Sequence, residues 1–211
     1  MAIDSIVQFE VSQDYLEWIR EAIREDEAGA IKESMADANA PDILTVLYEL
    51  NTEESKYIIK LLDEERAADI IVDIEEDQQP QFLRNFTAAE IARFIDYLDS
   101  DDGADILNRL PIKTREEVID KMENAEKAYH VKDLIRYEED HAGGLMAKEL
   151  IKVNIDWTVQ QCIEEIRRQA ENVEKIFSVY VVDKQNHLIG KVSLKKMILA
   201  RDQTKVADIY D

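Results

Sequence analysis

Residues 39–134 form an internal repeat with a period of twelve residues. Positions eight, nine and twelve of each unit are apolar, and only His130, at position eight of the last unit, departs from this pattern. Because residues three and four apart lie on one face of a helix, each unit is predicted to form a short helix with one apolar face. The units begin at Asn39, Asn51, Asp63, Glu75, Thr87, Asp99, Pro111 and Glu123.

The first position of most units favours the start of a helix. Asn, Asp or Thr occupies it in five units, and Pro111 is typical of a first helical turn. Two units also have the spacing of a capping box, Asn51 with Glu54 and Thr87 with Glu90. Helices of about two to three turns are not stable alone, so neighbouring units must stack around a shared apolar core. The sequence therefore predicts an α-solenoid, of either hand, over these residues.

A separate amphipathic helix is predicted before the repeat. Apolar residues recur at helical spacing within residues 11–26, and Trp18 lies beside the apolar face. Because glycine is unfavourable inside a helix, we expect Gly29 to end or interrupt this helix. A weaker helix is expected over residues 31–38.

The charge of the chain is unevenly distributed. The formal net charge is -21, but residues 1–140 contain 37 acidic and 15 basic residues, whereas residues 141–211 contain 10 and 11. The change near residue 140 suggests a domain boundary. An acidic surface repels phosphate backbones and anionic lipids, so we expect no nucleic acid partner. Cations are its natural counterions, although solubility alone can also account for the charge.

The last part of the chain is predicted to be a small α/β unit. Gly143 and Gly144 break helical continuity and mark a linker. The elements that follow have the order βαββα, and Thr158 with Gln161 forms a capping box for the first helix. They are a strand at 150–153, a helix at 159–170, strands at 179–182 and 187–192 joined by a turn at 184–186, and a helix at 194–200.

No catalytic pattern is found, and we interpret the chain as a non-enzyme. The single cysteine, Cys162, permits no internal disulfide and suits a reducing compartment. His130, His141 and His187 are isolated in the sequence and lack the spacing of zinc ligands. No segment resembles a signal peptide, and none approaches the ~20 apolar residues of a membrane span.

Several segments together resemble one family, the MgtE-type magnesium transporters. They read AGGLM at 142–146, VYVVD at 179–183, HLIGKVSLKKMILA at 187–200 and VADIYD at 206–211. These segments resemble the junction and first cystathionine-β-synthase (CBS) motif of that family. The helical repeat resembles its amino-terminal superhelical domain. The repeat alone also resembles flagellar-motor-switch domains.

The resemblance implies a multidomain α plus α/β protein with an acidic superhelical domain over residues 1–136, a linker over 137–148 and a first CBS motif over 149–211. We expect the second CBS motif and the membrane domain to be absent from this chain. The implied function is a Mg²⁺-sensing region on the cytoplasmic side of the cell membrane, attached to a membrane-spanning transporter. The family also implies homodimers formed through CBS motifs, with Mg²⁺ between the acidic faces of the two domains favouring the closed state.

Two pairs of acids have the spacing needed for a Mg²⁺ site. Mg²⁺ prefers six oxygen ligands and keeps several waters, so one or two carboxylates on each surface are enough. Glu65 with Asp69 and Asp101 with Asp105 lie four residues apart, on one helix face. By the resemblance, Asp69, Asp101 and Asp105 occupy the Mg²⁺-binding positions of the superhelical domain. The alternative is a solvated acidic helix face.

Two other functions remain open. CBS pairs in many proteins bind adenine nucleotides, but Ser178 stands where the related transporters often have an aromatic residue. Lys196 stands where an acid is common, so nucleotide binding is not expected. The other alternative is a soluble protein-interaction scaffold, similar to a flagellar-motor-switch repeat, without metal sensing.

Overall fold

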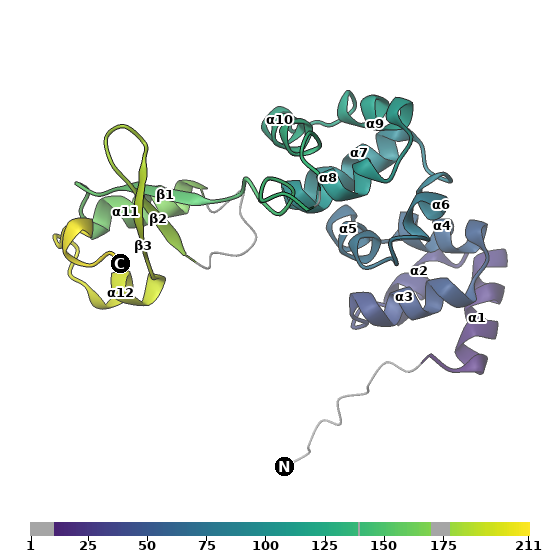
Figure 1. Cartoon of the computed structure of the whole chain (residues 1–211). Coiled ribbons are helices and arrows are strands. Elements are labelled where there is room, and N and C mark those ends of the chain that lie inside the picture. The colour runs from purple at the N-terminus through teal and green to yellow at the C-terminus, as the bar shows by residue number, and fades with distance from the viewer. Residues whose placement is uncertain (1–10, 139, 170–177) are drawn as a thin grey trace, which may run out of the picture. The chain divides into compact units, whose positions relative to one another are not determined.

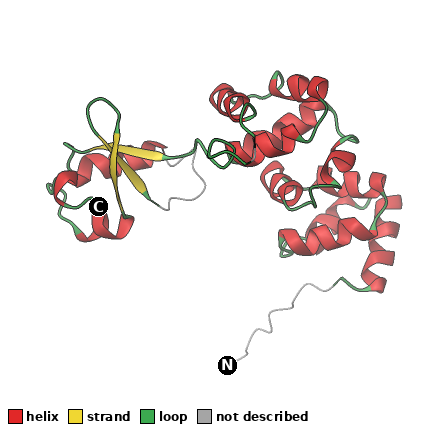
Figure 2. Cartoon of the chain, viewed as in Figure 1, coloured by secondary structure: helices red, strands yellow, loops and turns green. Residues whose placement is uncertain are grey.

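The computed structural model describes residues 11–138, 140–169 and 178–211. The chain divides into two compact units, Met1–Leu145 and Met146–Asp211 (Figure 1). Within the described residues, the first unit is built from helices, and the strands lie in the second unit (Figure 2). The predicted fold class, a helical repeat followed by a small α/β unit, is confirmed.

Each of the eight predicted units contains one helix. Two helices precede them, α1 (Gln13–Arg24) and α2 (Ala28–Ser34). The repeat helices are α3 (Ala40–Glu49), α4 (Thr52–Leu61), α5 (Glu64–Val72), α6 (Gln79–Leu83), α7 (Ala88–Tyr97), α8 (Ser100–Asn108), α9 (Ile112–Ile119) and α10 (Ala125–Leu134).

Alternate helices of the repeat stack on each other. Helix α5 packs between α3 and α7, α7 packs on α9, and α8 packs on α10. The structural repeat is therefore a pair of helices, or two sequence units. Long side chains bridge successive pairs: Arg93 Nη1 lies 3.0 Å from Glu64 Oε1, and Lys127 Nζ donates to the Leu98 carbonyl at 2.6 Å. The Lys127 contact satisfies a carbonyl group at the end of α7 that would otherwise lack a helical partner.

Most helix starts follow the predicted caps, although Pro111 is the N-cap of α9 and not a residue of its first turn. The capping boxes of Asn51 with Glu54 and of Thr87 with Glu90 are both formed. Helix α10 is capped by Asn124, one residue later than predicted. Helix α6 begins at Gln79, four residues after the predicted start of its unit, and has only five residues. The segment before it forms turns instead.

Most apolar positions of the repeat are buried in the core, as predicted, and five are only half-buried: Leu50, Leu62, Phe82, Ile119 and Met122. Ile58, Ile59, Ile70 and Ile71 are each at most 1% exposed. His130 is half-buried, while Val131 and Leu134, which occupy the other two apolar positions of the last unit, are buried. The expectation for Gly29 was wrong, because α1 already ends at Arg24 and Gly29 lies inside α2. The break comes at Asp26, whose φ of 57° reverses the chain between the two helices.

The second unit contains a three-stranded sheet in the order β1-β2-β3. β1 pairs in parallel with β2, and β2 pairs antiparallel with β3. Helix α11 packs on β1, and the capping box of Thr158 with Gln161 opens it. The elements are β1 (Ile151–Asn154), α11 (Val159–Gln169), β2 (Val179–Val182), β3 (Leu188–Val192), α12 (Leu194–Leu199) and the 3₁₀ helix η2 (Val206–Asp208). The predicted end of α11 at residue 170 lies outside the described residues.

The edge of β3 is covered by the last residue of the chain. The Lys191 N–H donates to the Asp211 carbonyl at 3.0 Å, and the Asp211 N–H donates to the Lys191 carbonyl at 2.8 Å. A Cβ added to Gly190 would lie 2.2 Å from the Asp211 oxygen and 2.6 Å from the Tyr210 ring. Glycine is therefore required for this close approach.

Candidate metal site in the helical unit

Helix α8 carries two of the three predicted ligands and is held firmly by its buried face. Ser100, Gly103, Ala104, Ile106 and Leu107 are buried. The Gly103 Cα lies so close to α7 and α10 that an added Cβ would be 3.0 Å from Ile95 Cγ2 and 3.4 Å from Val131 Cγ2. The backbone between Asp101 and Asp105 is therefore fixed by packing on both neighbours.

Asp101 has a carboxylate oxygen that protein groups leave unsatisfied. Its Oδ1 is buried and has no hydrogen-bond partner, and the residue as a whole is half-buried. Asp105 lies one turn further along the same helix and is also half-buried. Because a buried carboxylate oxygen without a donor is costly, this arrangement suits a cation that would supply the missing interaction.

Asp69 lies on the exposed face of α5, as does Glu65. Its neighbours Ala68 and Ile70 are fully buried in the core, so the carboxylate faces away from the packed side of the helix. Asp69, Asp101 and Asp105 do not appear together in any group of three described ligand residues whose atoms lie within 4.8 Å of one another. A Mg²⁺ ion at either position would therefore need water or ligands from elsewhere.

The structure brings together a different group, Glu138, Asp140 and His141, which sequence reasoning missed. It is the one set of three potential ligand residues in the described chain whose atoms lie within 4.8 Å of one another. His141 Nδ1 is 2.7 Å from Asp140 Oδ1 and 3.7 Å from Glu138 Oε2. All three residues are exposed. Their adjacency in the sequence was the available signal, and His141 lies on the surface, as expected.

His187 also contacts an acidic residue. Asp183 Oδ1 accepts the His187 N–H at 2.8 Å and the Gln185 N–H at 2.9 Å, and Asp183 Oδ2 lies 3.2 Å from His187 Nδ1. The backbone hydrogen bond from His187 is the largest influence on Asp183 and lowers the pKa of its carboxyl group. These bonds stabilise the turn between β2 and β3, where Asn186 has a φ of 64°. The His187 contacts are structural.

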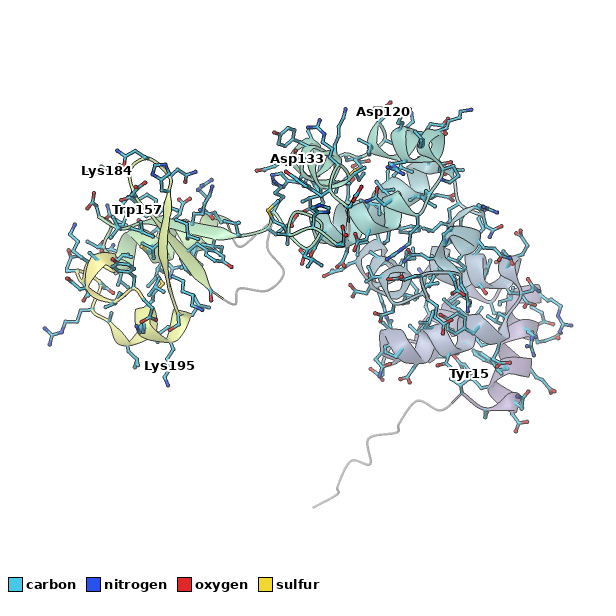
Figure 3. All side chains as sticks on the ribbon, viewed as in Figure 1. Tyr15, Asp120, Asp133, Trp157, Lys184 and Lys195 are labelled. Atoms are coloured by element: carbon cyan, nitrogen blue, oxygen red, sulfur yellow. The ribbon has the colours of Figure 1, made fainter. Side chains whose placement is uncertain are left out.

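Three residues that matter for nucleotide binding lie in the second unit: Ser178, Lys195 and Lys196. Ser178 is half-buried directly before β2. The Lys196 ammonium is paired with the Asp211 carboxylate. Lys195 is exposed and projects outward from α12 (Figure 3). An anion at this end of α12 would meet Lys195 directly and would compete with Asp211 for Lys196.

The comparison with known proteins identifies both units. Residues 38–140 match the MgtE intracellular N domain, and residues 142–202 match the CBS domain. A solved structure described as the cytosolic domain of the Mg²⁺ channel MgtE in complex with ATP is 30% identical. Its TM-score is 0.84, and the match covers 93% of this chain and 80% of that one. The chain belongs to the MgtE family.

Further MgtE relatives agree with this assignment. The magnesium transporter MgtE of Thermus thermophilus is 30% identical over 199 residues, which is 92% of this chain and 43% of the transporter. The soluble part of a magnesium transporter is 25% identical, with a TM-score of 0.79, over 94% of this chain and 78% of that chain. This MgtE chain thus spans less than half the length of its Thermus relative. The described part contains no helix that is both long and apolar enough to cross a membrane.

Proposed function

We propose that this chain is the Mg²⁺-sensing cytosolic region of an MgtE-type magnesium transporter. Mg²⁺ binds at Asp69 on α5 and at Asp101 and Asp105 on α8, and the bound ion favours the closed state. The observation that carries the proposal is the buried Asp101 Oδ1, which has no hydrogen-bond partner. A divalent ion is the ligand that this oxygen and the neighbouring Asp105 carboxylate suit best.

The charge of the helical unit provides the physical basis of the switch. Residues 1–140 carry a net charge of -22, so another acidic surface is repelled until a cation lies between them. Mg²⁺ keeps part of its water shell and needs only one or two carboxylates from each surface. The ion shifts the equilibrium toward closure because it binds the closed arrangement more tightly than the open one. The ligands outside the helical unit are proposed to come from the rest of the cytosolic region.

The second unit is proposed to pair with further CBS motifs and, through them, with a second copy of the protein. Its surface carries large apolar side chains that are unusually exposed for a soluble domain. Leu188 is 64% exposed, Ile198 78% and Leu199 76%. Large apolar side chains with such high exposure are common where a protein binds a partner. A second CBS motif, the membrane-spanning part and a partner subunit are the partners implied by this proposal.

The test is amide hydrogen exchange of the full-length protein at two Mg²⁺ concentrations that differ tenfold. The ionic strength is matched with NaCl, because any cation screens an acidic surface. We expect Mg²⁺ to slow exchange in α5 and α8. Asp101→Asn should abolish this protection, since the amide keeps the shape of the side chain but removes its charge. Asp120→Asn, at an exposed acid after α9, is the matched control and should leave the protection unchanged.

Two results would contradict Mg²⁺ sensing at these residues. In the first, exchange in α5 and α8 is the same at both Mg²⁺ concentrations. In the second, Asp101→Asn responds to Mg²⁺ as the unmodified protein does, which would assign the effect to general screening of the acidic surface.

Nucleotide binding by the second unit is a second candidate function. It is favoured by the solved MgtE relative, whose cytosolic domain was crystallised in complex with ATP. In this chain Lys195 is exposed and could meet a phosphate group, whereas Lys196 is paired with Asp211. Isothermal titration calorimetry with ATP tests it. Heat of binding that Lys195→Ala removes would support nucleotide binding, and no heat in the full-length protein would reject it.

A further inference from the structure

The helical unit contains a cavity where the repeat is irregular. Its volume is about 290 Å³, and it lies among α3, α4 and α6. Helix α6 has only five residues and carries Pro80 in its first turn, so it covers less of α3 than a full unit would. The lining residues are Leu44, Leu47, Tyr48, Leu50, Thr52, Ser55, Ile74, Gln78, Gln81, Phe82 and Asn85.

The cavity combines an apolar interior with uncharged polar groups. Leucine, isoleucine and phenylalanine side chains provide the apolar surface, and none of the lining residues is charged. Thr52 and Gln81 are exposed and carry a hydroxyl and an amide group. The Tyr48 hydroxyl oxygen accepts the Glu75 N–H at 3.3 Å, which leaves the hydroxyl proton to donate. Amide and hydroxyl groups match the N–H and C=O groups of a polypeptide without introducing charge.

The aromatic side of the cavity is held in place before any ligand arrives. The Phe82 ring lies 5.4 Å from the Phe86 ring, which in turn meets Phe94 edge-on at 5.5 Å. Lys56 Nζ lies 5.6 Å from the Phe86 ring centroid and donates to the Asn85 carbonyl. These contacts fix α6 against α4 and α7. A preformed site loses less entropy on binding than a mobile one.

The surroundings of the cavity are strongly acidic. Residues 44–85 contain 11 acidic and 4 basic residues, a net charge of -7. Glu49, Glu53 and Asp77 are exposed and adjoin lining residues in the sequence. Of the bases in this range, Lys56 donates to the Asn85 carbonyl, and Lys60 is paired with Glu90. From outside this range, Arg20 of α1 donates to the Glu49 carbonyl at 2.6 Å. A ligand entering the cavity therefore meets a negative field, which attracts cations and repels anions.

We propose that this cavity docks a basic polypeptide segment. One aliphatic or aromatic side chain of the segment fills the cavity, and lysine or arginine residues on either side lie over the acidic rim. Tyr48, Thr52 and Gln81 bond to its main chain. Helical repeat arrays commonly present such surfaces to partners. This docking requires no metal ion and is independent of Mg²⁺ sensing at Asp101 and Asp105.

The test uses the whole chain in EDTA, with a short fluorescent peptide whose ends are blocked. The peptide has a central Leu-Phe pair flanked by lysine and arginine. A second peptide has glutamate in the flanks, and a third has serine in place of the central pair. We expect binding of the first peptide only. Gln81→Trp, which places a large ring at the cavity, should weaken that binding at least tenfold.

Gln13→Trp adds the same ring at an exposed position of α1 that does not line the cavity, and it should bind as the unmodified chain does. Circular dichroism melting checks that each variant is folded. Tyr48→Phe provides a milder second test, because it removes only the hydroxyl group and should still weaken binding. The proposal is overturned if Gln81→Trp and Tyr48→Phe both bind normally. It is also overturned if the serine peptide binds as well as the first one, which would indicate attraction to the acidic surface alone.

Discussion

The Lys60 ammonium lies 2.5 Å from Glu90 Oε1 and joins α4 to α7. Glu90 also closes the capping box of α7, because its Oε2 accepts the Thr87 N–H at 2.7 Å. Burial raises the pKa of Glu90, but the bonds from Lys60 and Thr87 outweigh it and lower the pKa from 4.5 to about 2. One carboxylate thus fixes both the start of α7 and a contact between α4 and α7.

Glu90→Gln should lower the free energy of unfolding by about 1 kcal/mol at pH 7, since Lys60 is half exposed and the pair is partly screened. The folded-state pKa is depressed, so the stabilisation is complete above the unfolded pKa of 4.5 and is lost as the pH falls toward 2. Urea unfolding of both proteins at several pH values checks this. A stability difference that stays constant from pH 7 to pH 3 would disprove the role of the Glu90 charge.

Gly103→Val should destabilise the helical unit by about 1–3 kcal/mol, because the added groups would overlap Ile95 and Val131 in a packed core. Gly29→Val is the matched control. Gly29 is also inside a helix, but nothing lies within 4 Å of an added Cβ. The control should be neutral or slightly stabilising. Equal thermal midpoints for the two variants would show that Ile95 and Val131 leave enough space for a side chain at position 103.

Gly190→Ala should detach the end of the chain from β3, since its Cβ would overlap the Asp211 backbone oxygen and the Tyr210 ring. Exchange of the Lys191 and Asp211 amide hydrogens, measured by NMR, should become faster. Lys191→Ala is the control, because its backbone hydrogen bonds to Asp211 do not depend on the side chain. If both variants protect these amides as the unmodified chain does, the close approach at Gly190 is not required.

Cys162 should react slowly with thiol reagents while the protein is folded. Its side chain is 0% exposed, and burial raises the pKa of the thiol from 9.0 to about 11. A rise of this size reduces the thiolate fraction by about a hundredfold at neutral pH, and burial adds a steric barrier. Reaction with Ellman's reagent, in buffer and in urea, provides the measurement. Fast labelling in buffer would contradict the buried position.

The helical fold was predictable because the capping residues and the apolar positions indicate the same helix boundaries over most of the repeat. Asn51, Thr87 and their glutamates start helices where the apolar face also requires them. The fourth unit departs from this agreement. Its predicted cap, Glu75, is followed by two more acids and two glutamines before Pro80, so no apolar residue anchors the first turn. Stacking of alternate helices was not predicted, since a single twelve-residue period does not distinguish it from stacking of neighbours.

The candidate site was predictable only in part. Residue type and spacing indicated Asp101 and Asp105, but the burial of Asp101 Oδ1 depends on how α8 packs against its neighbours. The contact of His141 with Glu138 and Asp140 depends on a turn in which the His141 N–H donates to the Glu138 carbonyl at 3.0 Å. Turn geometry of this kind is set by a few backbone angles, which periodicity does not report.

Helix α8 packs so closely on α10 that a movement of α8 is expected to move α10 as well. With no side chain at Gly103, Val131 of α10 rests almost on the α8 backbone, leaving little slack between the two helices. Because packed interiors are hardly compressible, we expect a displacement of α8 to be transmitted to α10. The chain leaves the helical unit directly after α10, at residues 135–145. Cation binding at Asp101 or Asp105 is therefore expected to affect residues 135–138, where the chain continues beyond α10.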